Sequence, residues 1–115
     1  MSIKNRNSQI AKLTYCFDID GTLCKTNGMD YKISVPFKNV IKIVNKLHSN
    51  GNKIILYTAR GSLTGIDWLK VTKKQLKSWG VKYDKLVMGK PPADIYIDDK
   101  CMDIKDFMKN KGRYV

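Results

Sequence analysis

Acidic residues are scarce in this sequence, and they gather in two tight pairs. The chain has no glutamate, its ten acids are all aspartates, and four of them form the pairs Asp18/Asp20 and Asp98/Asp99. Carboxylates a few ångströms apart raise one another's pKa unless a cation lies between them. If the two pairs meet in the fold, they can hold a divalent cation, and an all-oxygen ligand set favours Mg²⁺ over Zn²⁺.

Each pair also has an ordinary structural interpretation. Asp20-Gly21 could form a hairpin turn, and Asp98-Asp99 could be a solvated strand end. A calcium loop is excluded, because the positions that need a glycine and an acid hold Leu23 and Met29. A zinc site lacks its usual ligands, since His48 is the only histidine and lies on an expected helix.

Strand and helix patterns alternate around these residues. Apolar runs predict strands over 13–18 and 53–58, a third over 83–88 and a short fourth over 94–98. Helical spacing predicts a helix from Pro36 to the closing Asn50-Gly51, another over 66–79, and a last one that carries Ile104 and Phe107. The loop that follows the first strand, over 24–34, is rich in lysine, asparagine and glycine.

This alternation predicts an α/β fold. We expect a single Rossmann-like domain over residues 1–115, with a short parallel sheet and helices on both of its faces. Ligands of such sheets bind outside the carboxyl ends of the strands. Asp18, Thr58 and Asp98 each end a predicted strand. Strand alternation should also project Asp18 and Asp20 to the same side.

In their order along the chain, these runs resemble the motifs of the haloacid dehalogenase superfamily. Phe17-Asp18-Ile19-Asp20-Gly21-Thr22-Leu23 is similar to the first motif and Thr58 to the second, while Lys90 is similar to the third and Asp98-Asp99 to the fourth. The runs Thr58-Ala59-Arg60-Gly61 and Gly89-Lys90-Pro91-Pro92 also resemble short, capless bacterial members labelled capsule or polysaccharide biosynthesis phosphatases. The resemblance covers residues 13–101 and implies a HAD-like domain without a cap.

The resemblance implies an Mg²⁺-dependent phosphatase that works through an aspartyl-phosphate. Asp18 would be the nucleophile. Asp20 would protonate the leaving oxygen and then deprotonate water, a role for which a pKa raised by burial is useful. The remaining implied roles are phosphate binding by Thr58, Ala59 and Lys90, and Mg²⁺ binding by Asp18, Asp20, Asp98 and Asp99.

Two features stay open at this stage. Arg60 could hold the non-phosphate part of the substrate or pair with Asp98-Asp99.

In the superfamily's sheet, the link over 89–93 must cross about three strand spacings, ~14 Å. Its five residues reach only roughly 17 Å. The third strand should therefore be very short or irregular, which leaves the placement of Lys90 uncertain. Only 24–34 and 60–65 could cover the site.

The net charge of +12 should attract anions, although it could also reflect composition alone. We expect a small phosphorylated substrate, such as a sugar phosphate. The alternatives are a nucleotide or nucleic-acid end, and a binding module without turnover. No apolar run is long enough for a membrane span, no signal peptide is visible, and the three cysteines lack paired spacing. These features predict a cytoplasmic protein, in which a second subunit of a homo-oligomer could lend a lid.

Overall fold

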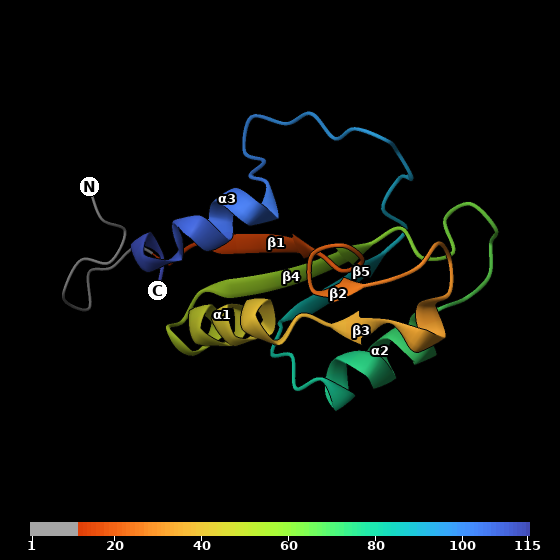
Figure 1. Cartoon of the computed structure of the whole chain (residues 1–115), viewed down its shortest axis with the longest axis horizontal. Coiled ribbons are helices and arrows are strands. Elements are labelled where there is room, and N and C mark those ends of the chain that lie inside the picture. Colours follow the sequence, from red (N-terminus) through yellow and green to blue (C-terminus); the bar gives the residue numbers. More distant parts are fainter. Residues whose placement is uncertain (1–11) are drawn as a thin grey trace.

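A parallel sheet forms the centre of the fold, in a computed structural model that describes residues 12–115 (Figure 1). Its strands are β1 (Thr14–Asp18), β4 (Lys53–Thr58) and β5 (Lys85–Met88), in the order β1-β4-β5. In the register, Asp18 pairs with Tyr57 and Thr58 pairs with Met88. The carboxyl ends of all three strands therefore meet at one edge of the sheet.

The described residues also form three α-helices and a small antiparallel ribbon. The helices are α1 (Lys38–Ser49), α2 (Leu69–Ser78) and α3 (Ile104–Lys109), and the ribbon consists of β2 (Cys24–Lys25) and β3 (Val35–Pro36). Short 3-10 turns cover Tyr31–Ile33 (η1) and Lys111–Arg113 (η2). No helix in the described part of the chain is long and apolar enough to cross a membrane.

The β2–β3 ribbon delays the start of α1 relative to the prediction. Pro36, predicted in the first turn of the helix, pairs instead with Cys24 in the ribbon. The Phe37 amide then donates a hydrogen bond to the Leu23 carbonyl at 2.8 Å. The chain is therefore held extended through Phe37, and α1 begins at Lys38.

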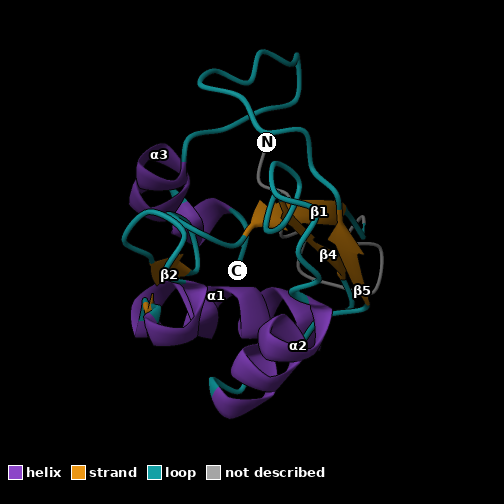
Figure 2. Ribbon diagram, turned by 90° about the vertical axis from the view of Figure 1, so that its right-hand side faces the viewer, coloured by secondary structure: helices purple, strands orange, loops and turns teal. Residues whose placement is uncertain are grey.

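The core lies on one face of the sheet. Phe17, Ile54 and Leu56 point to this face, and all three helices contribute to the same cluster, through residues such as Val44, Leu76 and Phe107. On the opposite face, Cys16 is exposed, and Ile55 and Tyr57 are only half-buried. Figure 2 shows the helices gathered on one side of the strands. For the described residues, the prediction of helices on both faces is therefore wrong.

Aromatic packing explains why α3 lies on the core face. The Phe107 ring meets Phe17 edge-on at a centroid distance of 5.7 Å and stacks on Tyr114 at 5.2 Å. Asp103 caps the helix by accepting a hydrogen bond from the Lys105 amide at 2.9 Å. A helix of six residues is marginal by itself, so this packing and the cap hold α3 beside β1.

The predicted fourth strand over 94–98 does not form. Residues 91–103 contain no strand or helix, all of them are exposed, and in Figure 1 they arch away from the sheet. Ile95 and Ile97 are 75% and 93% exposed. The physical reason is the short link: β5 and β1 are opposite edges of the sheet, so a strand that follows β5 directly would have to cross β4 and β1 to pair beyond them.

Candidate active site

Asp18 and Lys90, far apart in the chain, form an ion pair at the carboxyl end of the sheet. The Lys90 Nζ lies 3.5 Å from Asp18 Oδ1, and the two side chains are 14% and 36% exposed. The Lys90 amide donates to the Thr58 carbonyl at 2.9 Å, which holds Lys90 against β4 beyond the end of β5. Gly89, with φ of +89°, makes the turn between the end of β5 and Lys90. The structure therefore places Lys90 beside the first aspartate, a position that the link length had left uncertain.

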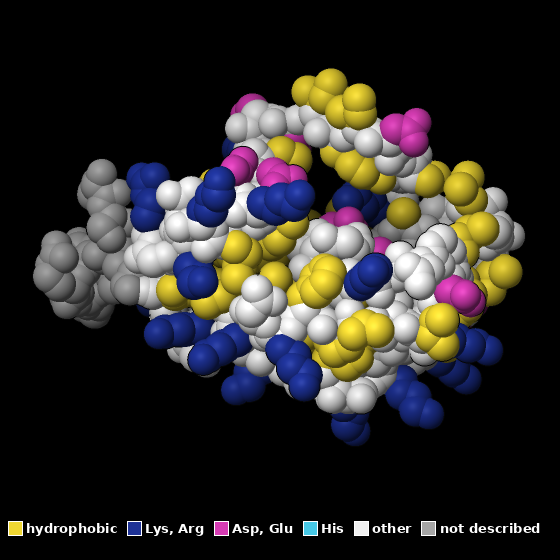
Figure 3. All heavy atoms as spheres, in the orientation of Figure 1, with side chains coloured by type: hydrophobic (Ala, Val, Ile, Leu, Met, Phe, Trp, Pro, Cys, Tyr) yellow, Lys and Arg dark blue, Asp and Glu magenta, His cyan; other side chains and the backbone are white. Residues whose placement is uncertain are grey.

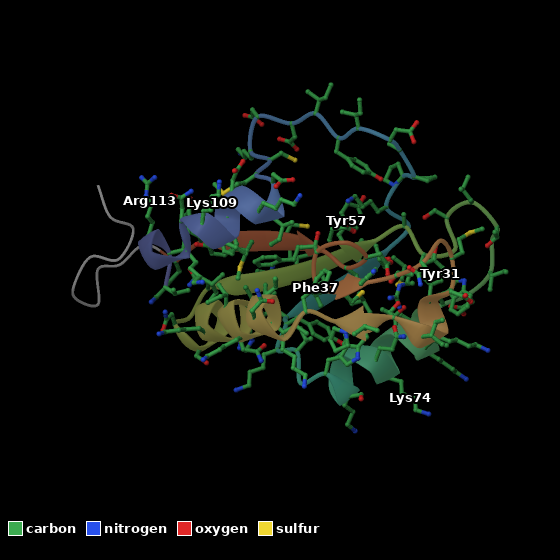
Figure 4. The ribbon with its side chains drawn as sticks, viewed as in Figure 1. Tyr31, Phe37, Tyr57, Lys74, Lys109 and Arg113 are labelled. Atoms are coloured by element: carbon green, nitrogen blue, oxygen red, sulfur yellow. The ribbon has the colours of Figure 1, made fainter. Side chains whose placement is uncertain are left out.

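Two tyrosines flank the Lys90 ammonium. It lies 4.0 Å from the centroid of the Tyr96 ring and 5.9 Å from that of Tyr57, both within cation–π range. Tyr57 comes from β4, and Figure 4 labels it near the end of the sheet. Tyr96 comes from the exposed 91–103 segment, and sequence reasoning misses its role because residues 94–98 have the alternating pattern of a strand.

Burial raises the pKa of Asp18, although the nearby Lys90 ammonium and the Ile19 amide act in the opposite direction. Asp18 is a half-exposed carboxylate whose charge is balanced by one lysine. Such a group can present an oxygen to an incoming electrophile, while the ammonium offers positive charge to any anion bound next to it.

Asp20 has a different partner, Arg60. The Arg60 Nε donates to Asp20 Oδ2 at 3.0 Å and Nη2 to Oδ1 at 2.9 Å, which makes a bidentate pair. Nη1 donates to Thr72 at 3.1 Å and to Gln75 at 2.6 Å, both on α2. The guanidinium also lies 4.9 Å from the centroid of the Tyr31 ring, which Figure 4 labels.

These contacts correct both interpretations of Arg60. Its side chain is wholly buried, and its donors are occupied by Asp20 and α2, so it offers none to a substrate. It also makes no contact with Asp98-Asp99. The sequence contained one usable signal, the polar Thr72 on the core-facing side of a predicted helix.

The pKa shifts of the first pair run opposite to the prediction. Burial acts to raise the pKa of Asp20, but hydrogen bonds from Arg60 and Thr26 hold it below its ordinary value. The carboxyl group with the raised pKa is Asp18. The expected burial-raised pKa of Asp20 is therefore wrong. The two groups also have separate ion-pair partners, Lys90 for Asp18 and Arg60 for Asp20.

Thr58 is the last residue of β4, and Ala59 follows it; both come directly after Tyr57, the residue that pairs with Asp18. Thr58 is fully buried on the core face, and its hydroxyl accepts a hydrogen bond from the Arg60 amide at 3.1 Å. Ala59 is half-buried, and its carbonyl accepts from the Ser62 amide at 2.9 Å. In this arrangement the Thr58 hydroxyl orients the following loop and is not open to a phosphoryl group.

The loop over residues 60–65 is hydrogen-bonded to the backbone of Lys90. The Ser62 hydroxyl donates to the Lys90 carbonyl at 2.9 Å. A hollow of about 210 Å³ lies beside the loop, with Trp68 and Met88 among its lining residues. The sequence predicted that residues 60–65 could cover the site, and the Ser62 contact does bring this loop next to the Asp18–Lys90 pair.

The late acid pair lies outside the site. Asp98 and Asp99 are exposed on the 91–103 segment, and a hydrogen bond from the Lys100 amide lowers the pKa of Asp98. Within residues 12–115, no three aspartate, histidine or cysteine side chains group closely enough to hold a metal ion. The residues as arranged therefore do not fit the Mg²⁺ site that the sequence predicted from Asp18, Asp20, Asp98 and Asp99.

Comparison with known proteins finds two solved structures that resemble this chain. No family model and no curated protein matches the chain. A crystal structure of a target protein from Vibrio cholerae aligns with a TM-score of 0.77 and 28% identity, over 90% of this chain and 96% of that chain. A structure of the Pnkp1/Rnl/Hen1 complex aligns with a TM-score of 0.57 and 20% identity, over 90% of this chain and 36% of that chain. The α/β fold is therefore shared with both structures.

Proposed function

We propose that the protein is a phosphomonoesterase of the haloacid dehalogenase type, with Asp18 as the nucleophile. The observation that carries the proposal is the Asp18–Lys90 ion pair at the carboxyl end of a parallel sheet. This ion pair joins one residue of the first motif and one of the third, which are 72 positions apart in the chain. It lies at the edge of the sheet where ligands of such folds bind. The resemblance of the sequence to that superfamily supplies the reaction class.

The proposed reaction has two steps at phosphorus. An Asp18 oxygen forms a bond to phosphorus while the bond from phosphorus to the leaving oxygen breaks, and the leaving oxygen takes up a proton from water. Water then attacks the aspartyl-phosphate, the bond between phosphorus and the Asp18 oxygen breaks, and phosphate leaves. Lys90 offsets the negative charge of the phosphoryl group in both steps, which is the dominant need of phosphoryl transfer.

Asp20 suits the second step better than the first. The Arg60 pair holds it as a carboxylate, which can accept the proton of the attacking water. A carboxylate has no proton to give to a leaving oxygen. We therefore assign Asp20 the role of general base, and Arg60 the role of holding its carboxyl group in place.

The described residues do not assemble a site for Mg²⁺. The requirement for Mg²⁺, which the resemblance to the superfamily implies, therefore stays a prediction. Phosphate release is to be measured with added Mg²⁺ and with EDTA. Activity that EDTA abolishes and Mg²⁺ restores would confirm the requirement, and equal activity in both would contradict it.

The direct test of the proposal is phosphate release from an aryl phosphate by wild type and by Asp18→Asn. The variant keeps the shape of the side chain but removes the nucleophilic charge, so turnover should fall at least about a thousandfold. Asp106→Asn is the matched control, since Asp106 is an exposed aspartate on α3, and it should leave the rate unchanged. Wild-type activity that persists in Asp18→Asn would refute the assignment of the nucleophile.

A substrate screen separates the remaining alternatives. Sugar phosphates, nucleotides and oligonucleotides with terminal phosphates are to be compared at low and high salt, because contacts with a phosphate backbone weaken steeply with salt. Preference for a sugar phosphate is the expected result. A protein that releases no phosphate and traps no beryllium fluoride adduct would be a binding module.

A further inference from the structure

The lysines of α1 and α2 form two rows on the surface. Lys38, Lys42 and Lys46 follow one another at intervals of four residues on α1, and α2 carries Lys70, Lys73, Lys74 and Lys77. All seven are exposed, and neither helix contains an acid. A four-residue interval along a helix is about 6 Å. Each helix therefore presents a regular row of positive charge.

These lysines have no ion-pair partners among the residues that the structure describes. The three ion pairs there involve His48, Arg60 and Lys90, so no carboxylate lies within 4.0 Å of any lysine in the rows. In Figure 3, Lys and Arg side chains line the lower rim, where α1 and α2 lie in Figure 1, and others lie near α3. Among the described residues, the seven lysines of α1 and α2 therefore form a surface whose positive charge no ion pair neutralises.

A groove of about 400 Å³ lies between the two helices. Lys38, Lys42 and Asn45 line it from α1, and Ser78 and Trp79 line it from the end of α2. Trp79 is half-buried: it packs against the core and also lines the groove. Positive rows beside a groove that contains an aromatic ring are typical of surfaces that bind a single nucleic-acid strand, because phosphates meet the lysines and a base can stack on the ring.

A membrane surface fits these helices less well. Helices that lie on a bilayer insert large apolar side chains between the lipid headgroups. Among the described residues, none of the exposed large apolar residues is on α1 or α2; Ile33 ends η1, Val35 is in β3, and others, such as Leu63 and Ile97, lie in loops. The face therefore offers charge and a groove, without an apolar surface to insert.

We propose that the face formed by α1 and α2, which we call the lysine face, binds the backbone of single-stranded nucleic acid. The site is separate from the Asp18–Lys90 pair and needs no turnover. Each neutralised phosphate of a single strand contributes about −0.7 to the slope of log affinity against log salt, so four contacts give about −3, or about a fiftyfold loss from 50 to 200 mM salt.

The test is fluorescence anisotropy of a labelled single-stranded oligonucleotide of about 16 nucleotides. The lysine-face variant is Lys38→Gln/Lys42→Gln/Lys73→Gln/Lys77→Gln. The matched control neutralises four other exposed lysines, in Lys100→Gln/Lys105→Gln/Lys109→Gln/Lys111→Gln, and so removes the same four charges from +12. Figure 4 shows Lys109 and Lys74 near opposite ends of the molecule.

We expect the lysine-face variant to lose at least tenfold in affinity, and the control to change less than about threefold. Arginine at the same four positions of the face should retain binding and the salt slope. Equal losses in the two glutamine variants would overturn the proposal, because they would show a general effect of net charge.

Three further results would also overturn the proposal. The first is no binding of the oligonucleotide by wild type at low salt. The second is tighter binding of a duplex than of the single strand. The third is wild-type binding to vesicles of phosphatidylserine and phosphatidylcholine with none to the oligonucleotide, which would assign the face to a membrane. Binding is measured without turnover, so the result is independent of the phosphatase activity.

Discussion

Replacing Arg60 with methionine should destabilise the protein strongly. The Arg60 side chain is wholly buried and makes a bidentate pair with Asp20, whose side chain is 27% exposed. The variant keeps much of the apolar volume but removes the cationic partner of the Asp20 carboxylate and leaves only its hydrogen bond from Thr26 among the two that lower its pKa most. Removing one partner of a buried pair costs about 3–5 kcal/mol, and the partial exposure of Asp20 reduces this to about 2–3 kcal/mol. For a domain of this size, the melting temperature should fall by about 10 °C.

The pH dependence of this loss follows from the pKa of Asp20. Because the folded protein holds that pKa below its ordinary value, the stabilisation is present above the unfolded pKa of about 3.9 and is lost as the pH falls through the folded pKa. The difference between wild type and Arg60→Met should therefore be largest near neutral pH and shrink in acid.

Urea unfolding followed by tryptophan fluorescence measures these differences. Arg113→Met, at an exposed arginine, is the control and should stay within about 0.5 kcal/mol of wild type. The double variant Asp20→Asn/Arg60→Met should show a coupling energy of about 1–3 kcal/mol between the two positions. A loss below about 1 kcal/mol at neutral pH, or strictly additive single variants, would refute the buried pair as a source of stability.

Two further changes test neighbouring parts of the site. Lys90→Met removes the cation that opposes the effect of burial, so the pKa of Asp18 should rise further; a carboxyl titration by NMR measures it, and an unchanged value would contradict the ion pair. Gly61→Ala should destabilise far more than Gly21→Ala, although both glycines have positive φ, because a Cβ at Gly61 would clash with the Ile66 carbonyl oxygen and one at Gly21 would meet nothing within 4 Å. Thermal melts of both variants measure this, and equal losses would show that backbone conformation alone sets the cost.

The three parallel strands were predictable because their signals are local. The run that contains Ile54 and Leu56 gives β4 with the bounds that the sequence predicts. The fourth strand failed for the opposite reason. Residues 94–98 alternate like a strand, but a strand also needs a partner edge, and the length of the preceding link decides whether the chain can reach one.

The sequence predicted some members of the candidate site, but Asp98 and Asp99 lie outside it and Tyr96 was missed. The spacing of Asp18 and Asp20 marked both residues, and motif position marked Lys90. The partner of Asp20 is Arg60, which lies 40 positions away in the chain. A charge pair across that separation depends on where the loop after β4 turns, and local pattern does not specify it. The pKa of Asp20 follows from this pairing, so its direction could not be predicted either.

The 91–103 segment gives the chain a place where its length can change at little cost. The sheet is complete at Met88, and α3 begins only at Ile104, held by its own aromatic contacts. Between them, a doubling of loop length adds only about 0.6 kcal/mol of closure entropy. A peptide tag or a small folded module inserted here should leave both the sheet and α3 intact, which makes this segment the natural attachment point for a reporter.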